Sequence, residues 1–148
     1  MSIRSYGFLS LAFLPLTAKV DELMSKKVVT IDSSSTAFDA AREMLDHDIG
    51  CIVVLSGKKV LGIATKSDII REAVMKRLDS QKIGVESIMS KPVISIDARS
   101  SLSEASETMS RHNITKLPVL EKGELVGVIT STDLVRRTRP KKLAKDMI

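Results

Sequence analysis

The sequence repeats itself at a fixed spacing of 65 residues, and this repeat restricts the possible folds more than any other feature. GIATKSD at 62–68 returns as GVITSTD at 127–133, and VDELMSKKVVTID at 20–32 returns as VESIMSKPVISID at 85–97. The spacing holds without a gap from residue 20 to residue 71. Unrelated segments do not keep register over such a length, so the chain contains two copies of one structural unit.

Each copy shows the same order of hydrophobic patterns, which predicts helix, strand, helix, strand, strand and helix. In the first copy, apolar residues recur at helical spacing near 20–24 and 37–44. Runs of β-branched residues at 28–31 and 52–55 predict strands, and the run that ends at Thr65 predicts a third. The short Gly-containing loop between the last two runs predicts a hairpin.

Polar pairs mark the helix starts. Thr36 with Asp39, and their counterparts Ser101 with Glu104, have the spacing of capping boxes, which satisfy the first amides of a helix. For the last helix we expect the cap to be Ser67 in the first copy and Thr132 in the second.

The two copies are expected to fold together. One copy of about 60 residues buries too little surface to be secure alone, whereas two copies can share a core. We therefore expect an extension at 1–18, a first domain at 19–80, a second domain at 81–138 and a tail at 139–148.

Composition indicates a globular protein of a reducing compartment. Apolar residues make up 43% of the 148 residues and charged residues 28%. The single cysteine, Cys51, excludes an internal disulfide. Residues 1–18 loosely resemble a secretory signal, but they are too short for a membrane span and are interrupted by Pro15. We expect a cytoplasmic protein that does not enter a membrane.

The net charge of +5 is concentrated at one end. Residues 136–148 contain six basic residues and one acidic residue, which accounts for the whole excess. Such a tail could bind nucleic acid in a salt-dependent manner, although it has no aromatic residue to stack on bases. A solvated helix end is the alternative explanation.

The repeated heptad combines residue types that suit a nucleotide. Gly62 and Gly127 would allow a close approach to the backbone of a strand. Thr65 and Thr130 stand where a strand ends and a helix begins, where free amides favour a phosphate. The aspartate three residues later could accept hydrogen bonds from a ribose diol. The alternative is an ordinary helix cap with no ligand.

Catalytic signatures are missing from the sequence. There is no phosphate-binding Gly-x4-Gly-Lys-Ser/Thr loop, no metal-ligand cluster and no nucleophile in a recognisable setting. His47 and His112 repeat each other near helix ends, where hydrogen-bonding residues are favoured without a metal. We therefore expect a binding protein rather than an enzyme.

The duplicated order of elements, the doubled G-x-x-T-x-x-D heptad and the phrase MSK-x-V-x-(S/T)-I-D together resemble the cystathionine β-synthase (CBS) domain, present here as a tandem pair or Bateman module. The resemblance covers residues 20–138, nearly the whole chain. It implies an α/β (α+β) fold in which two units of helix-strand-helix-strand-strand-helix pack as a pseudo-twofold pair.

The resemblance also implies ligand-binding positions. In similar CBS pairs the aspartate holds ribose hydroxyls, the threonine contacts ribose or phosphate, and strand edges hold the adenine. Lys116 matches the family's basic position facing a phosphate, whereas the first copy has Cys51 there, which makes equal occupancy of the two sites doubtful. The expected ligand-binding residues are Thr30, Ile31, Gly62, Thr65, Lys66 and Asp68 from the first copy, and Ser95, Ile96, Ile114, Lys116, Pro118, Gly127, Thr130, Ser131 and Asp133 from the second.

Family members of this kind bind adenosine nucleotides or related adenosyl ligands and regulate an attached or partner protein. The sequence therefore predicts a free-standing sensor of AMP, ADP or ATP that forms a homodimer and acts on an unidentified partner. Two alternatives remain open: a nucleic-acid-associated protein that uses the basic tail, and a dimerisation scaffold without a ligand.

Overall fold

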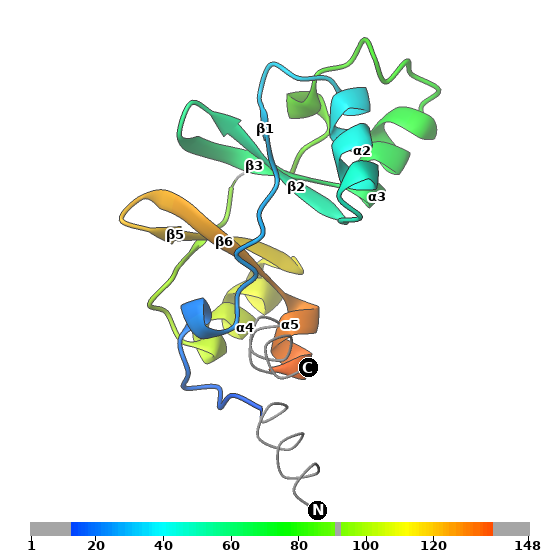
Figure 1. Ribbon diagram of the computed structural model, residues 1–148. Helices are drawn as coiled ribbons and strands as arrows, with labels where there is room; N and C mark the ends of the chain where they lie inside the picture. The colour runs from blue at the N-terminus through cyan, green and yellow to red at the C-terminus, as the bar shows by residue number, and fades with distance from the viewer. Residues whose placement is uncertain (1–12, 91–92, 138–148) are drawn as a thin grey trace, which may run out of the picture. The chain divides into compact units, whose positions relative to one another are not determined.

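The computed structural model describes residues 13–90 and 93–137 (Figure 1). The predicted tail at 139–148 and most of the predicted extension at 1–18 lie outside the described residues.

Both repeats have the predicted order of elements. The first repeat contains the 3-10 helix η1 (Val20–Glu22), β1 (Thr30–Asp32), α2 (Ala37–Asp46), β2 (Cys51–Ser56), β3 (Lys59–Thr65), α3 (Lys66–Ile69) and the π-helix η2 (Ile70–Val74). The second contains the 3-10 helix η3 (Val85–Ser87), β4 (Ile96–Asp97), α4 (Leu102–His112), β5 (Lys116–Glu121), β6 (Glu124–Thr130) and α5 (Ser131–Arg136).

Each repeat forms one three-stranded sheet, in the order β1-β2-β3 and β4-β5-β6. The first strand runs parallel to the central strand, and the last strand runs antiparallel to it. The start of the first strand, the start of the central strand and the end of the last strand therefore lie at one end of each sheet. The predicted mixed fold of helices and strands is confirmed.

Local signals explain where the elements begin and turn. Thr36 Oγ1 accepts a hydrogen bond from the Asp39 amide at 3.1 Å, and the Asp39 carboxylate accepts one from the Thr36 amide at 3.0 Å, as predicted for a capping box. Ser101 Oγ caps α4 through the Glu104 amide at 3.0 Å, but among the described residues no reciprocal bond completes that box. The hairpin loops contain Gly57 at φ +61° and Gly123 at φ +81°, a conformation that glycine adopts more readily than residues with a Cβ atom.

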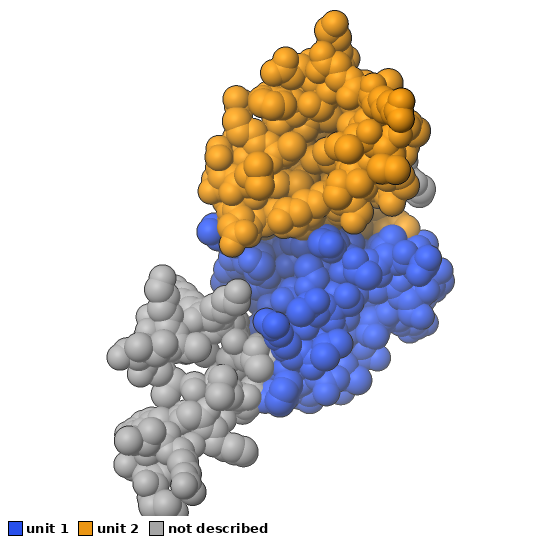
Figure 2. All heavy atoms as spheres, turned by 90° about the vertical axis from the view of Figure 1, so that its right-hand side faces the viewer, with its two compact units in different colours: residues 1–27, 95–148 blue, residues 28–94 orange. Residues whose placement is uncertain are grey.

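The compact units of the structure do not coincide with the sequence repeats (Figure 2). Unit 1 is formed by residues 1–27 and 95–148 as far as they are described, and unit 2 is formed by residues 28–94. The opening segment of each repeat therefore belongs to the sheet of the other repeat. In unit 1 the Val20 amide donates to Ser100 O at 2.7 Å, and in unit 2 the Val85 amide donates to Ser35 O at 2.9 Å.

The core of each unit lies under its long helix. In both units the apolar face predicted for that helix is buried, which confirms the helical spacing of these residues. In unit 2 the cluster comprises Ala37, Ala40, Met44, Ile52, Val54, Ala64, Val85 and Ile88. In unit 1 the corresponding buried residues include Val20, Leu102, Ala105, Met109, Leu117, Val119 and Ile129. No helix in the described part of the chain has the length and apolar character needed to cross a membrane.

Candidate functional site

The repeated heptad forms a strand-to-helix corner in each unit, here called the Thr65 corner (Gly62–Asp68) and the Thr130 corner (Gly127–Asp133). Asp68 Oδ2 accepts a hydrogen bond from the Thr65 amide at 2.9 Å, and Thr65 Oγ1 accepts one from the Asp68 amide at 3.1 Å. Thr130 and Asp133 make the same two bonds at the same distances. Each heptad is therefore a reciprocal capping box.

This geometry corrects the predicted helix starts. Thr65 and Thr130 are the caps, and Ser67 and Thr132 lie inside the first turn. The reason is the spacing: a reciprocal box needs an acid three residues after the cap, and of these four residues only Thr65 and Thr130 have one.

The glycines of the corners accommodate the chain itself. A Cβ atom on Gly127 would lie 2.5 Å from Met24 Sδ and 2.8 Å from Ser25 O. A Cβ atom on Gly62 would lie 2.8 Å from Met89 Sδ and 2.9 Å from Ser90 O. Ser25 and Val128 exchange both amide-to-carbonyl bonds, at 2.9 and 3.0 Å. The predicted close approach to the backbone is therefore made by the Met-Ser phrase of the other repeat.

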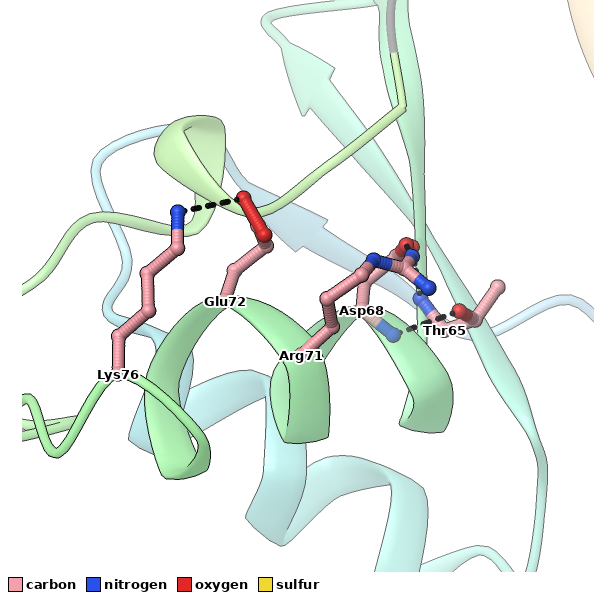
Figure 3. A network of polar contacts seen from close by, with 5 residues as sticks. All are labelled: Thr65, Asp68, Arg71, Glu72 and Lys76. Carbon is pink, nitrogen blue, oxygen red and sulfur yellow. Dashed lines mark hydrogen bonds and ion pairs between the residues drawn. The ribbon is translucent and has the colours of Figure 1, made fainter.

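The Asp68 carboxylate is almost completely enclosed. The side chain is 7% exposed, and its second oxygen, Oδ1, accepts a hydrogen bond from Arg71 at 2.7 Å (Figure 3). One turn further along, Lys76 pairs with Glu72 at 3.0 Å. Arg71 was not among the residues predicted from the sequence, although its position three residues after an aspartate is the spacing of a helical ion pair.

Strand register brings some of the predicted residues to one end of each sheet and leaves Gly62, Ile96 and Gly127 nearer its middle. In unit 2, Cys51 pairs with Thr65 across β2 and β3, and Thr30 pairs with Val53 near the same end. In unit 1, Lys116 pairs with Thr130 across β5 and β6. Ile96 of β4 lies opposite Val119, and Ser95 precedes it.

The predicted residues differ in exposure and fall into three groups. Thr30 and Lys66 are exposed, and Ile31, Thr65, Ser95, Ile114, Lys116, Thr130, Ser131 and Asp133 are half-buried. Pro118, Ile96, Gly62 and Gly127 are buried, so their side chains or Cα atoms belong to the interior of their units.

A hollow of about 450 Å³ lies in unit 1 between α4 and α5. Two predicted residues, Ile114 and Ser131, contribute to its lining, together with Met109 and Leu134. Thr130, Asp133 and Lys116 are not among its lining residues. The hollow therefore lies beside the Thr130 corner, on the other face of α5 from Asp133.

The two histidines bond to their own helices. His47 Nδ1 lies 3.0 Å from Glu43 O, and His112 Nδ1 lies 3.0 Å from Thr108 O. Each ring therefore interacts with a carbonyl of the last turn. In the described residues no group of three or more potential ligand side chains could hold a metal ion.

Comparison with known proteins identifies the repeat. The family model of the CBS domain matches the chain twice, over residues 20–74 and 85–139. The CBS domain-containing protein YhcV of Bacillus subtilis is 31% identical over 117 residues, which cover 79% of this chain and 83% of that protein. The chain spans somewhat less than two thirds of two other relatives, 63% of the uncharacterized protein MJ0450 of Methanocaldococcus jannaschii and 62% of the uncharacterized protein MK0525 of Methanopyrus kandleri.

Solved structures share the fold. The CBS domain pair of protein MJ0100, in complex with 5′-methylthioadenosine and S-adenosyl-L-methionine, has a TM-score of 0.72 and 28% identity, over 82% of this chain and 95% of that one. A hexameric CBS-CP12 protein from bloom-forming cyanobacteria has a TM-score of 0.73 and 25% identity, over 80% of this chain and 69% of that one. With both repeats matched by the family model, the chain belongs to the CBS-domain family and contains a tandem pair of these domains.

Proposed function

We propose that this CBS-domain pair binds an adenosine nucleotide or a related adenosyl ligand and thereby regulates a partner protein. The observation that carries the proposal is the duplicated corner. Each unit places a threonine hydroxyl and an aspartate carboxylate at the end of its sheet where β1 and β2, or β4 and β5, begin.

The chemistry of the Thr130 corner suits the sugar and phosphate of a nucleotide. Asp133 Oδ2 accepts a hydrogen bond from the Thr130 amide, and Oδ1 accepts none from the residues that the structure describes, so it can accept one from a ribose diol. Lys116 lies across the strand pair from Thr130 and can supply a positive charge to a phosphate. The solved complex of the MJ0100 domain pair with two adenosyl compounds supports this ligand class.

The role that fits this arrangement is regulatory. The two carboxylates lie in different units, each within its own capping box, which favours two binding positions over a pair of catalytic acids. A ligand that prefers one arrangement of the domains would shift the population toward it and so alter a partner's binding surface.

Self-association is part of the proposal. Unit 2 exposes large apolar residues on α2 and on the helical segment after β3, and such surfaces are typical of protein interfaces. Leu45 is 77% exposed, Met75 72%, Val74 61% and Ile70 53%. We expect a homodimer through this face, while the hexameric CBS-CP12 protein indicates that larger assemblies occur among similar chains.

Thermal unfolding with added ligand tests the binding proposal. A ligand at 100 times its Kd stabilises the folded state by about 2.7 kcal/mol, which corresponds to a rise in Tm of roughly 5–10 °C for a chain of this size. AMP, ADP, ATP and S-adenosylmethionine should be tested separately. We expect at least one of them to raise Tm, and we expect the double variant Asp68→Ala/Asp133→Ala to lose the rise.

The control for this experiment is Asp39→Ala. Asp39 belongs to a capping box of the same geometry as the corners, but it lies at the start of α2. Its removal should lower Tm in the absence of ligand and leave the ligand-dependent rise intact. If no adenosine compound changes Tm of the wild-type protein, the binding proposal is wrong and a ligand-free scaffold becomes the better interpretation.

A further inference from the structure

The two corners are equivalent in sequence, but their carboxylates differ in hydrogen-bond partners and in exposure. At the Thr65 corner both oxygens of Asp68 are used: Oδ2 accepts the Thr65 amide at 2.9 Å and Oδ1 accepts Arg71 at 2.7 Å (Figure 3). The carboxylate is also nearly buried, with 7% of the side chain exposed. Each oxygen still has a second lone pair, but Arg71 and the burial of the carboxylate together obstruct an incoming diol at Oδ1 unless Arg71 moves away.

The Thr130 corner has the same residues without the same ion pair. Arg136 stands three residues after Asp133, as Arg71 stands three residues after Asp68. Among the residues that the structure describes, Asp133 forms no ion pair, and its Oδ1 accepts no hydrogen bond. Asp133 is also half-buried where Asp68 is buried, so its carboxylate is more accessible.

A second difference lies on the central strand of each sheet. Lys116 is the first residue of β5 and pairs with Thr130, whereas Cys51 is the first residue of β2 and pairs with Thr65. Both side chains are half-buried at these matching positions. Only the Thr130 corner therefore has an ammonium group in register with its threonine, where it can bind an anionic ligand.

We propose that the two sites are unequal because Arg71 closes the Thr65 corner, so that an adenosine nucleotide binds first at the Thr130 corner. This inference rests on the proposed function and adds the order in which its sites fill. Arg71 is a specificity-determining residue that competes with the ligand's diol for Asp68 Oδ1. Lys116 increases the difference by adding a phosphate contact from the central strand, where the Thr65 corner has Cys51; Lys66, next to Thr65, can offset part of this difference.

The expected size of each contribution follows from the kind of contact. Arg71 is 64% exposed, so its pair with Asp68 has the strength of a surface ion pair, and its loss should tighten the closed site about two- to fivefold. A charge-assisted hydrogen bond from Lys116 to a phosphate corresponds to about tenfold or more in affinity. Together they predict that the first nucleotide binds at least about tenfold more tightly than the second.

Calorimetric titration of the full chain with ATP, repeated with AMP, tests this order. Asp68→Ala leaves only the Thr130 corner and should retain the tight site. Asp133→Ala leaves only the Thr65 corner and should retain the weak site. In the Asp133→Ala background, Arg71→Ala should tighten ATP binding two- to fivefold, and Arg71→Lys should have a smaller effect because it keeps the charge but loses the fork geometry.

The matched control is Arg136→Ala in the Asp68→Ala background. Arg136 occupies the equivalent position but does not hold Asp133, so its removal should give no gain in affinity. Equal affinities for Asp68→Ala and Asp133→Ala, or weaker binding on removal of Arg71, would overturn the inference while leaving the proposed function intact. If the wild-type chain binds neither ATP nor AMP, the proposed function fails for these nucleotides, and this inference fails with it.

Discussion

The substitution Gly127→Ala tests how the repeats exchange their opening segments. The added Cβ would lie 2.5 Å from Met24 Sδ and 2.8 Å from Ser25 O. The sulfur belongs to a flexible side chain and can move, but the carbonyl is backbone. It accepts a hydrogen bond from the Val128 amide at 3.0 Å, and the Ser25 amide donates to Val128 O at 2.9 Å. The opening segment must therefore move away from β6, which loosens this two-bond bridge.

The expected destabilisation can be estimated from these contacts. Overpacking a filled site costs about 1–3 kcal/mol, and each lost hydrogen bond costs about 1 kcal/mol net. Because the two effects partly overlap, Gly127→Ala should lower the free energy of unfolding by about 2–4 kcal/mol. Gly62→Ala should lower the free energy of unfolding by less, because its contacts are slightly longer, at 2.8 and 2.9 Å. Among the described residues, one hydrogen bond of 3.0 Å, from the Ser90 amide to Ile63 O, joins the opening segment of the second repeat to β3 there.

Urea unfolding followed by far-UV circular dichroism measures the effect, since the chain has no tryptophan. Gly50→Ala is the control, because a Cβ at that position meets no atom within 4 Å and its φ is not positive. It should change stability by less than about 0.5 kcal/mol. If Gly127→Ala is as mild as Gly50→Ala, the close approach of the Met-Ser segment to β6 is not a constraint and the explanation for this glycine is wrong.

The remaining predictions concern two capping boxes. Hydrogen bonds from the backbone and side chain of Thr36 lower the pKa of Asp39, so its contribution to stability is present above the pKa of the unfolded chain and is lost as pH falls through the folded value. Asp39→Asn should therefore reduce the fall in the urea midpoint below about pH 4; an unchanged fall would contradict this role. Asp133→Asn keeps an oxygen for the Thr130 amide but replaces the free oxygen with a donor. It should weaken ATP binding more than tenfold while changing the urea midpoint little. If ATP binding and the urea midpoint both fall, the ligand-binding role of Asp133 cannot be separated from its helix-capping role.

The fold was largely predictable because its signals are local and occur twice. The apolar faces of α2 and α4 and the hairpin loops each depend on residues close in sequence. The exchange of the opening segments was not predictable in this way. Nothing within residues 20–27 indicates which sheet they join, because both sheets have the same glycine at the accepting position. The choice is made by contacts between segments that are far apart in sequence, such as Ser25 with Val128, and no local pattern indicates these contacts.

The site was predicted in residue type but not in local role. Ser67 and Thr132 have good cap residue types, but they lack an acid three residues later, and the structure uses Thr65 and Thr130. The ion pair of Arg71 with Asp68 was also missed. A helical spacing of three permits such a pair without requiring it, and the equivalent Arg136 does not form one with Asp133 within the described residues.

One motif therefore has two different consequences in this chain. Thr-x-x-Asp occurs as a reciprocal capping box at Thr36, at Thr65 and at Thr130, with hydrogen bonds between 2.9 and 3.1 Å in all three. The box at Thr36 follows the end of β1, which is the end of the sheet where the β2–β3 hairpin turns. The other two lie at the opposite end, where the central strand begins and presents Cys51 or Lys116. The capping box alone starts a helix, and it is the strand register around it that turns two of the three boxes into candidate binding sites.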